Sequence, residues 1–168
     1  MAQSLDRKGD VKDAIAAYLA VLRDDQDNLE ALRGLALDYL FLNDFTEALP
    51  VQEKIVALDP KDAQTRVELA FNYLNHQKEP AKAVEYLTQA VVLEPSAKNL
   101  TFLGQAQIVA ADLSGAEQTL GKALKTDPKY PHSYIVLLSL LESQKRNSDV
   151  AKLRERAHSN GVDLSQTT

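Results

Sequence analysis

The stretch Leu29–Pro60, LEALRGLALDYLFLNDFTEALPVQEKIVALDP, has the pattern of two short helices joined by a turn. In its first part, apolar residues recur every three or four positions and so share one face of a helix: Leu32, Leu35, Ala36 and Tyr39. Asn43-Asp44 interrupts this pattern, and Asp44 is a suitable N-cap with an acidic residue, Glu47, three positions later. A second apolar stripe follows and ends at Asp59-Pro60, because proline disfavours a helical conformation in the residue before it. Two such helices bury one face against each other and leave another face for a neighbouring unit.

This unit repeats along the chain with a countable period. The positions in one leucine column rise by a constant step: Leu35, Leu69, Leu103 and Leu137. A second column keeps nearly the same step: Ala14, Ala48, Ala83, Ala116 and Val150. In that second column one residue is gained before Pro80 and lost again after Pro95. A helix–turn–helix period of about 34 residues, held over nearly the whole chain, indicates an array of about five units and not one globular domain.

The repeat predicts an all-α protein with ten helices, the first of them short. We expect units at about 1–28, 29–62, 63–96, 97–130 and 131–161, followed by a frayed tail at 162–168. Turns within the units are expected near Gly9, Asn43, Lys78, Asp112 and Arg146, and turns between units near Gln26, Pro60, Pro95 and Pro128. Asn160-Gly161 suits a left-handed helix end. Gly104 is expected at a close contact between helices, and Pro50 is expected to kink its helix without breaking it.

Composition limits the function classes. The hydrophobic content of 45% is enough for a continuous core between stacked helices. The net charge of −5 and the lack of a long basic cluster argue against a nucleic-acid partner. The chain has no cysteine, and no apolar run is long enough to span a membrane. No signal-peptide pattern begins the sequence, which favours a cytoplasmic location unless an anchor or signal precedes Met1.

The first unit begins in the middle of its first helix. Met1, Ala2 and Leu5 share one side of this expected segment, and Leu5 lies one full period before Tyr39. One explanation is that the chain is a fragment of a longer protein, and the other is a naturally short first helix. In either case the apolar end is open to pairing with a second copy through a two-fold contact.

The repeat columns resemble those of the tetratricopeptide repeat family. Leu35-Ala36 with Tyr39, and Leu69-Ala70 with Tyr73, resemble its pattern of a leucine, a small residue and an aromatic, and the Asp-Pro and Glu-Pro endings resemble its closing proline. The chain departs from the family by having no tryptophan, and Gln107 replaces the tyrosine of the column. The resemblance implies a right-handed superhelix, an α-solenoid, whose first helices line a concave groove. It also implies a scaffold without catalytic activity that binds peptides or helices of other proteins.

By this resemblance, the residues expected to line the groove are Arg33, Leu37, Leu40, Phe41, Val67, Phe71, Leu74, Asn75, Lys98, Thr101, Gln105 and Ile108, followed by His132, Ile135, Ser139 and Glu142. One known subset of the family grips a carboxylate with lysine, asparagine and arginine, and this chain does not match it. Arg33 and Lys98 would instead favour an acidic flank beside an apolar partner segment. The alternative is that the apolar members of the set simply pack between helices.

Residues for catalysis or for holding a cofactor are sparse. His76, His132 and His158 fall in three different units without metal-ligand spacing. The glycines are scattered and form no phosphate-binding loop. We therefore expect no enzyme activity, no cofactor and no metal. A protein-interaction scaffold is the favoured function, and the alternatives are a homo-oligomerisation module or a regulatory or adaptor part of a larger enzyme or membrane-anchored protein.

Overall fold

The computed structural model describes residues 2–164, with side chains from residue 9 onward. Within this range every regular element is a helix and no strand occurs, as the repeat predicted. The helices are α1 (Ala2–Asp24), α2 (Leu29–Phe41), α3 (Phe45–Leu58), α4 (Ala63–Asn72), the π-helix η1 (Tyr73–Gln77), α5 (Pro80–Leu93), α6 (Ala97–Val109), α7 (Leu113–Thr126), α8 (Pro131–Ser143) and α9 (Asn147–Ser159).

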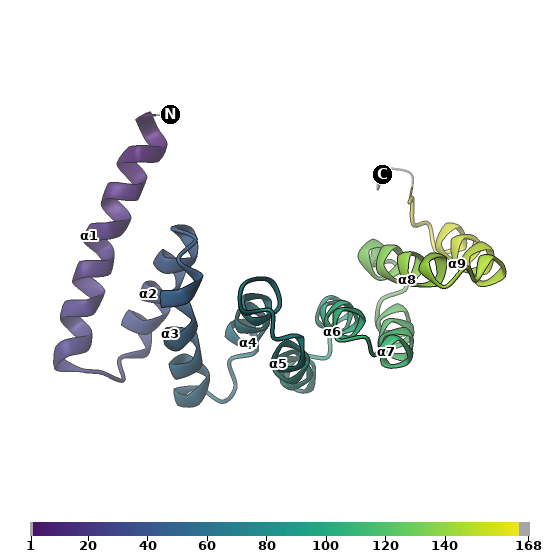
Figure 1. Cartoon of the computed structure of the whole chain (residues 1–168). Helices are drawn as coiled ribbons and strands as arrows, with labels where there is room; N and C mark the ends of the chain where they lie inside the picture. Colours follow the sequence, from purple (N-terminus) through teal and green to yellow (C-terminus); the bar gives the residue numbers. More distant parts are fainter. Residues whose placement is uncertain (1, 165–168) are drawn as a thin grey trace.

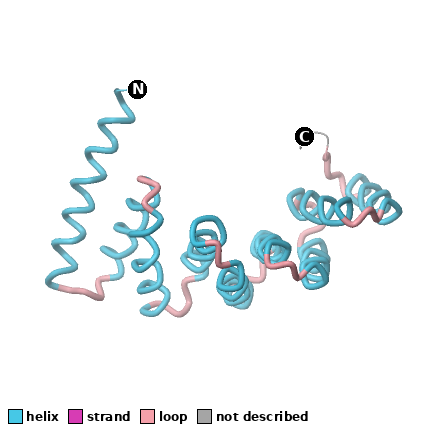
Figure 2. Tube along the Cα trace, viewed as in Figure 1, coloured by secondary structure: helices cyan, strands magenta, loops and turns pink. Residues whose placement is uncertain are grey.

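The helices form a curved array in which contacts run mainly between neighbours along the chain (Figure 1). The pairs α2–α3, α4–α5, α6–α7 and α8–α9 follow one another, and the two ends of the array rise on the same side (Figure 2). In this view α4 and α6 lie toward the opening between the two ends, and α5 and α7 lie on the outer side. In these two pairs the first helix therefore faces the hollow of the curve.

Side chains of the loops fix where the helices begin. The N-cap side chain accepts a hydrogen bond from the backbone N–H three residues later at Asn28, Asp44, Asp62, Ser96 and Asp112. At the cap predicted from the sequence, Glu47 N donates to Asp44 Oδ1 at 3.2 Å. The same local interaction thus starts each of these helices.

The turn inside each pair has one repeated geometry. One residue in each turn has a positive φ, namely Asn43, Lys78, Ala111 and Lys145. A backbone hydrogen bond then closes the turn: Asp44 N donates to Tyr39 O and Asp112 N to Gln107 O, both at 2.8 Å, and Arg146 N donates to Leu141 O at 3.0 Å. The predicted positions of these four turns are confirmed.

The π-helix η1 accommodates the residue gained in the third unit. Glu79 N donates to Tyr73 O at 2.9 Å, so this turn is closed across six residues, whereas the other turns are closed across five. Tyr73 occupies the same repeat position as Tyr39, so the closing acceptor is unchanged. The wider π-helical turn takes up the extra residue, and the columns before and after it keep their register.

The predicted turn at Gly9 is wrong. Gly9 and Asp10 lie inside α1, so one helix of 23 residues replaces the two helices that were expected. A separate helix of eight residues would be marginal in water, and a turn would break several backbone hydrogen bonds. The cost of a glycine inside a helix, about 1 kcal/mol relative to alanine, is smaller than that loss. The shared face expected for Met1, Ala2 and Leu5 lies outside the side chains described.

The C-terminal end is ordered further than expected. Gly161 has φ +73°, and Val162 N donates to Ala157 O at 2.9 Å, which confirms the left-handed end predicted at Asn160-Gly161. Val162 is buried, and Leu164 packs on the same cluster, so the fraying expected from residue 162 is wrong for these two residues. Few apolar residues of α9 are buried, so α9 covers only part of the apolar surface of the last pair. Val162 covers more of that surface. The expected tail at 165–168 lies outside the described residues.

The columns found in the sequence form the core. Ala48, Ala83, Ala116 and Leu69 are fully buried, and Leu35 is almost so. Pro50 lies inside α3, which continues unbroken to Leu58. Gly104 also has the predicted close contact, since a Cβ atom at this position would lie 2.7 Å from Cγ of Leu120 in α7.

We predict that Gly104→Leu overpacks the α6–α7 contact and lowers the free energy of unfolding by about 1–3 kcal/mol. Gly121→Leu is the matched control, because nothing lies within 4 Å of a Cβ atom built on Gly121. Urea unfolding followed by circular dichroism measures both variants. Equal stabilities for the two would contradict the close contact at Gly104.

Candidate partner-binding site

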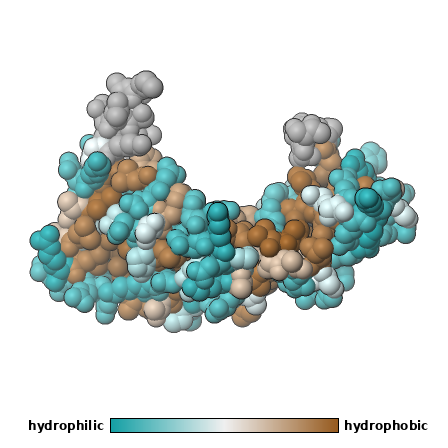
Figure 3. Space-filling view, viewed as in Figure 1, coloured by the Kyte–Doolittle hydropathy of each residue, from teal (hydrophilic) through white to brown (hydrophobic). Residues whose placement is uncertain are grey.

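The hollow side of the array carries a surface that we call the inner face. It consists of accessible residues on α2, α4, η1 and α6: Arg33, Leu37, Leu40, Phe41, Glu68, Phe71, Leu74, Asn75, Lys98, Phe102, Gln105, Ile108 and Val109. Its apolar members reach solvent at several points: Leu37 is 58% exposed, Phe41 is 51% exposed and Val109 is 58% exposed. In the view of Figure 3, apolar surface is visible at the α1–α3 end of the array and again near α6.

Two residues expected in the groove lie beneath this surface. Val67 is buried in the core, and Thr101 is fully buried with its hydroxyl bonded to Ala97 O at 2.7 Å and to Ser133 Oγ at 2.6 Å. Thr101 therefore links α6 to α8. The accessible neighbours of these two residues are Glu68 and Phe102, which sequence reasoning missed. The i+4 spacing of Phe102 from Lys98 could have indicated it, but the i+3 spacing of Thr101 satisfies helical periodicity equally well.

An aromatic pair connects the second and third helices of the inner face. Phe71 of α4 and Phe102 of α6 meet edge to face with ring centroids 4.9 Å apart. The Nζ atom of Lys98 lies 5.8 Å from the centre of the Phe102 ring. Phe71, Leu74 and Phe102 are partly buried against the α4–α6 core. They therefore offer ring edges to a partner while remaining fixed by packing beneath.

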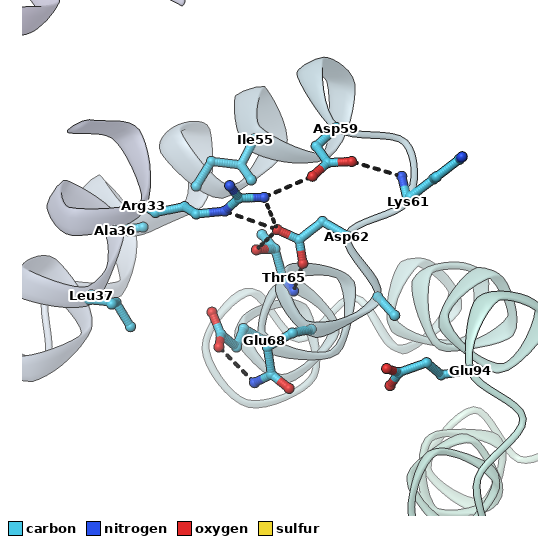
Figure 4. A pocket seen from close by; sticks show the side chains of 12 residues that line it. Arg33, Ala36, Leu37, Ile55, Asp59, Lys61, Asp62, Thr65, Glu68 and Glu94 are labelled. Carbon is cyan, nitrogen blue, oxygen red and sulfur yellow. Dashed lines mark hydrogen bonds and ion pairs between the residues drawn. The ribbon is translucent and has the colours of Figure 1, made fainter. Parts of the chain in front are cut away.

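Arg33 is not a free positive charge, contrary to the expectation from the sequence. Its Nη2 atom lies 2.8 Å from Asp59 Oδ2 and 3.0 Å from Asp62 Oδ2, as Figure 4 shows. Hydrogen bonding to Asp62 and then to Asp59 raises the pKa of Arg33. The guanidinium thus ties α2 to the loop before α4. It neutralises carboxylates of this chain and is not available to attract an acidic partner.

Asp62 is the centre of this network. Burial by itself favours the neutral carboxyl group, but the backbone and side-chain hydrogen bonds from Thr65 and the contact with Arg33 outweigh it and lower the pKa of Asp62. Thr65 N donates to Asp62 Oδ1 at 2.9 Å, and Thr65 Oγ1 donates to Asp62 Oδ2 at 2.8 Å. One carboxylate therefore caps α4 and anchors Arg33.

A cavity of about 530 Å³ opens beside Arg33. Its walls come from α2, the end of α3, the start of α4 and Glu94 at the end of α5. Figure 4 shows Leu37 at one side, Glu94 at the other and the Glu68 carboxylate between them. Gln64 Nε2 donates to Glu68 Oε1 at 2.8 Å and orients that carboxylate.

The far end of the hollow side is polar. Gln105 of α6 and His132 of α8 face each other with 3.1 Å between their Nε2 atoms, and the rings of Tyr130 and His132 are 6.4 Å apart. Ile135 is half-buried and Ser139 is exposed. Glu142 accepts a hydrogen bond from Arg154 at 2.9 Å and is therefore already paired.

The polar clusters outside the inner face have structural explanations. The Tyr73 hydroxyl donates to Glu53, and burial followed by this bond raises the pKa of Tyr73 to about 12, so it stays protonated at neutral pH. His76 stacks on Phe45 with ring centroids 3.4 Å apart. Among the side chains described, those of residues 9–164, no three of metal-binding type gather into a group that could hold a metal ion.

Comparisons with known proteins agree with the repeated helix pairs. A family model described as tetratricopeptide repeat matches residues 1–63. The crystal structure of MamA has a TM-score of 0.81 at 23% identity, and the match covers 96% of this chain and 94% of that chain. YrrB, described as a TPR protein with an unusual peptide-binding site, has a TM-score of 0.77 at 18% identity over 95% of this chain and 82% of that chain.

A third solved structure contains a ligand. The first TPR domain of Spaghetti (RPAP3), bound to the HSP90 peptide SRMEEVD, has a TM-score of 0.63 at 20% identity over 72% of this chain and 96% of that chain. No curated protein matches the sequence. Residues 1–63 thus match the tetratricopeptide repeat model, and nearly the whole chain shares the helical-repeat fold of MamA and YrrB. None of the helices between residues 2 and 164 has both the length and the apolar character needed to cross a bilayer.

We predict that Asp62→Ala lowers the free energy of unfolding at pH 7 by about 1–2 kcal/mol, because it removes an N-cap and one partner of Arg33. The folded-state pKa of Asp62 is lowered, so its contribution is complete above the unfolded value of about 4 and is lost as the pH falls through the folded value. Urea unfolding at pH 7 and at about pH 2.5 measures the difference between wild type and variant. Lys61→Ala on the exposed neighbour is the control, and a difference that persists at low pH would contradict the role of the charge.

Proposed function

We propose that this protein is a non-catalytic interaction scaffold that binds a peptide or helix of a partner protein along its inner face. The observation that carries the proposal is the pair of strongly exposed apolar side chains on α2, Leu37 and Phe41. They continue into the half-buried ring pair of Phe71 and Phe102. Exposed apolar side chains that gather on one face are typical of a partner site.

The shape of the inner face favours an elongated ligand. Leu37 and Phe71 are one repeat period apart, so the same repeat position is apolar in α2 and in α4, and Ile108 and Val109 supply apolar surface on α6. An amphipathic helix or an extended segment presents apolar side chains at regular intervals and can meet such a row. The peptide-binding site named for YrrB and the peptide bound to Spaghetti are consistent with this use of the fold.

A library of random 12-residue peptides displayed on phage, selected on the wild-type chain, supplies a defined probe. We predict that Phe71→Ser weakens binding of a selected peptide by about 2 kcal/mol, roughly 30-fold, because it removes an apolar anchor at the centre of the face. Fluorescence anisotropy of the labelled peptide measures the dissociation constant. Glu85→Ser, on an exposed position of α5, is the control and should bind as the wild type does.

Phe71 also contributes to the core, so a second variant separates binding from folding. Leu37→Ser changes a side chain that is 58% exposed and should weaken the same peptide while leaving the circular dichroism spectrum and the melting temperature close to wild type. If both variants bind the peptide as wild type does, the inner face is not the partner site. If only Phe71→Ser loses binding and it also loses its helicity, Phe71 is a core residue and not an anchor.

Self-association is a second candidate function, and the exposure of α1 favours it. Val21 is 43% exposed, whereas its repeat equivalents Ile55, Ala90 and Ala123 are at most 1% exposed. Ala14 is half-buried, whereas Ala48, Ala83 and Ala116 in its column are fully buried. The first helix of the same pair covers this face in α3, α5 and α7. Within the described residues no helix covers it on α1, and a second copy of α1, packed antiparallel about a two-fold axis, would do so.

We predict for this second candidate that the wild type has a mass near twice 18.5 kDa in solution and that Val21→Lys returns it to the monomer mass, because a charged side chain would be buried at the contact. Light scattering after size exclusion, over a range of protein concentrations, measures the mass. Val92→Lys, at a 78% exposed position of α5, is the matched control and should leave the mass unchanged. A wild type that stays at 18.5 kDa at every concentration would contradict self-association.

A further inference from the structure

The cavity beside α2 is lined by an apolar side chain and by more carboxylates than cations. Leu37 forms the apolar side and is the most exposed of the leucines in this part of the inner face. The Glu94 carboxylate lies at the opposite side, and the Glu68 carboxylate lies between Leu37 and Glu94 (Figure 4). Glu68 is half-buried and held by Gln64, and Glu94 is exposed at the end of α5. The cavity therefore offers a fixed carboxylate, a second carboxylate and a hydrocarbon surface to one ligand group.

The charges that line the cavity do not balance. Four carboxylates, those of Asp59, Asp62, Glu68 and Glu94, face two cations, Arg33 and Lys61, which leaves a formal charge of minus two. Arg33 is already shared by Asp59 and Asp62 at 2.8 and 3.0 Å. A ligand carboxylate would meet the negative charges of Glu68 and Glu94 without a free arginine to pair with. A ligand cation, in contrast, would find two acceptors.

We propose that this cavity is a specificity subsite that receives an arginine or lysine side chain of the bound peptide. The hydrocarbon stem lies against Leu37, and the cationic head lies between Glu68 and Glu94, since long basic side chains bury their stems and keep the charge at a polar rim. This inference rests on the proposed peptide-binding function and names the class of partner, a basic peptide with flanking apolar residues. A basic peptide replaces the acidic partner segment expected from the sequence, because Arg33 is already paired with Asp59 and Asp62.

The test uses peptides selected by phage display on the full chain. The selected sequences should be enriched in arginine or lysine next to leucine or phenylalanine. Replacement of the key arginine by citrulline keeps the size and hydrogen-bonding shape but removes the charge, and it should weaken binding about tenfold, the range of two partly exposed ion pairs. The double variant Glu68→Gln with Glu94→Gln should weaken binding of the arginine peptide by a similar factor, and Glu85→Gln should not.

A double-mutant cycle makes the assignment specific. If the peptide arginine contacts Glu68 and Glu94, replacing it by citrulline should change the affinity for the double variant only slightly. In that variant the two carboxylates that would pair with the arginine charge are absent. A tenfold loss with citrulline on both proteins would overturn the inference, and so would selected peptides without arginine or lysine. In either of those cases, sensitivity of the same peptide to Leu37→Ser and Phe71→Ser would still support the proposed function. Selection of no peptide at all would overturn both.

Discussion

The close contact between the two helices of each pair is the constraint on which the rest of this structure depends. It is made by small residues, because Ala48, Ala83 and Ala116 are fully buried and Gly104 has room for no side chain beside Leu120. Such contacts let two short helices share one apolar face, but each pair still exposes another apolar face. Stacking buries that second face, so every pair depends on its neighbour. The curvature and the hollow side of the array follow from repeating the same contact.

This constraint explains why the extra residue of the third unit is accommodated by a π-helix in the turn, while α5 keeps its position against α4. If α5 moved by one residue, Ala83 would leave the small-residue contact. Instead, Tyr73 remains the acceptor that closes the turn, and η1 absorbs the insertion between Tyr73 and Glu79. The contact between Phe71 and Phe102 of the next pair is unaffected, because Phe71 precedes the insertion. The length of the turn inside a pair can thus differ between units while the buried repeat positions stay in register.

The period of the sequence was sufficient to predict the helices and turns because it reflects contacts that recur in every pair. It failed where a contact is made only once. The turn predicted at Gly9 had no packed pair to hold it, and α1 continued. On the inner face, a difference of one residue, about a quarter of a turn, decides whether Val67 or Glu68, and Thr101 or Phe102, reaches solvent, and only the packing of neighbouring helices settles it. The pairing of Arg33 with Asp59 and Asp62 joins residues 26 and 29 positions apart that no periodicity connects.

The pairing of Arg33 with Asp59 and Asp62 commits these charges to the fold. Asp62 caps α4 and holds Arg33, so these two charges act within the chain and tie α2 to the loop before α4. Fixing them has an electrostatic consequence: the carboxylates of Glu68 and Glu94 keep their negative charge unopposed by an arginine. A rigid wall with defined charge loses little conformational freedom when a ligand binds, which favours affinity and selectivity together. The wall of the cavity is negative because Arg33 is paired within the chain, so the presence of an arginine in the sequence did not predict the sign of the charge of the wall. A basic residue on the inner face of such an array therefore predicts an acidic partner only after its own carboxylate partners have been counted.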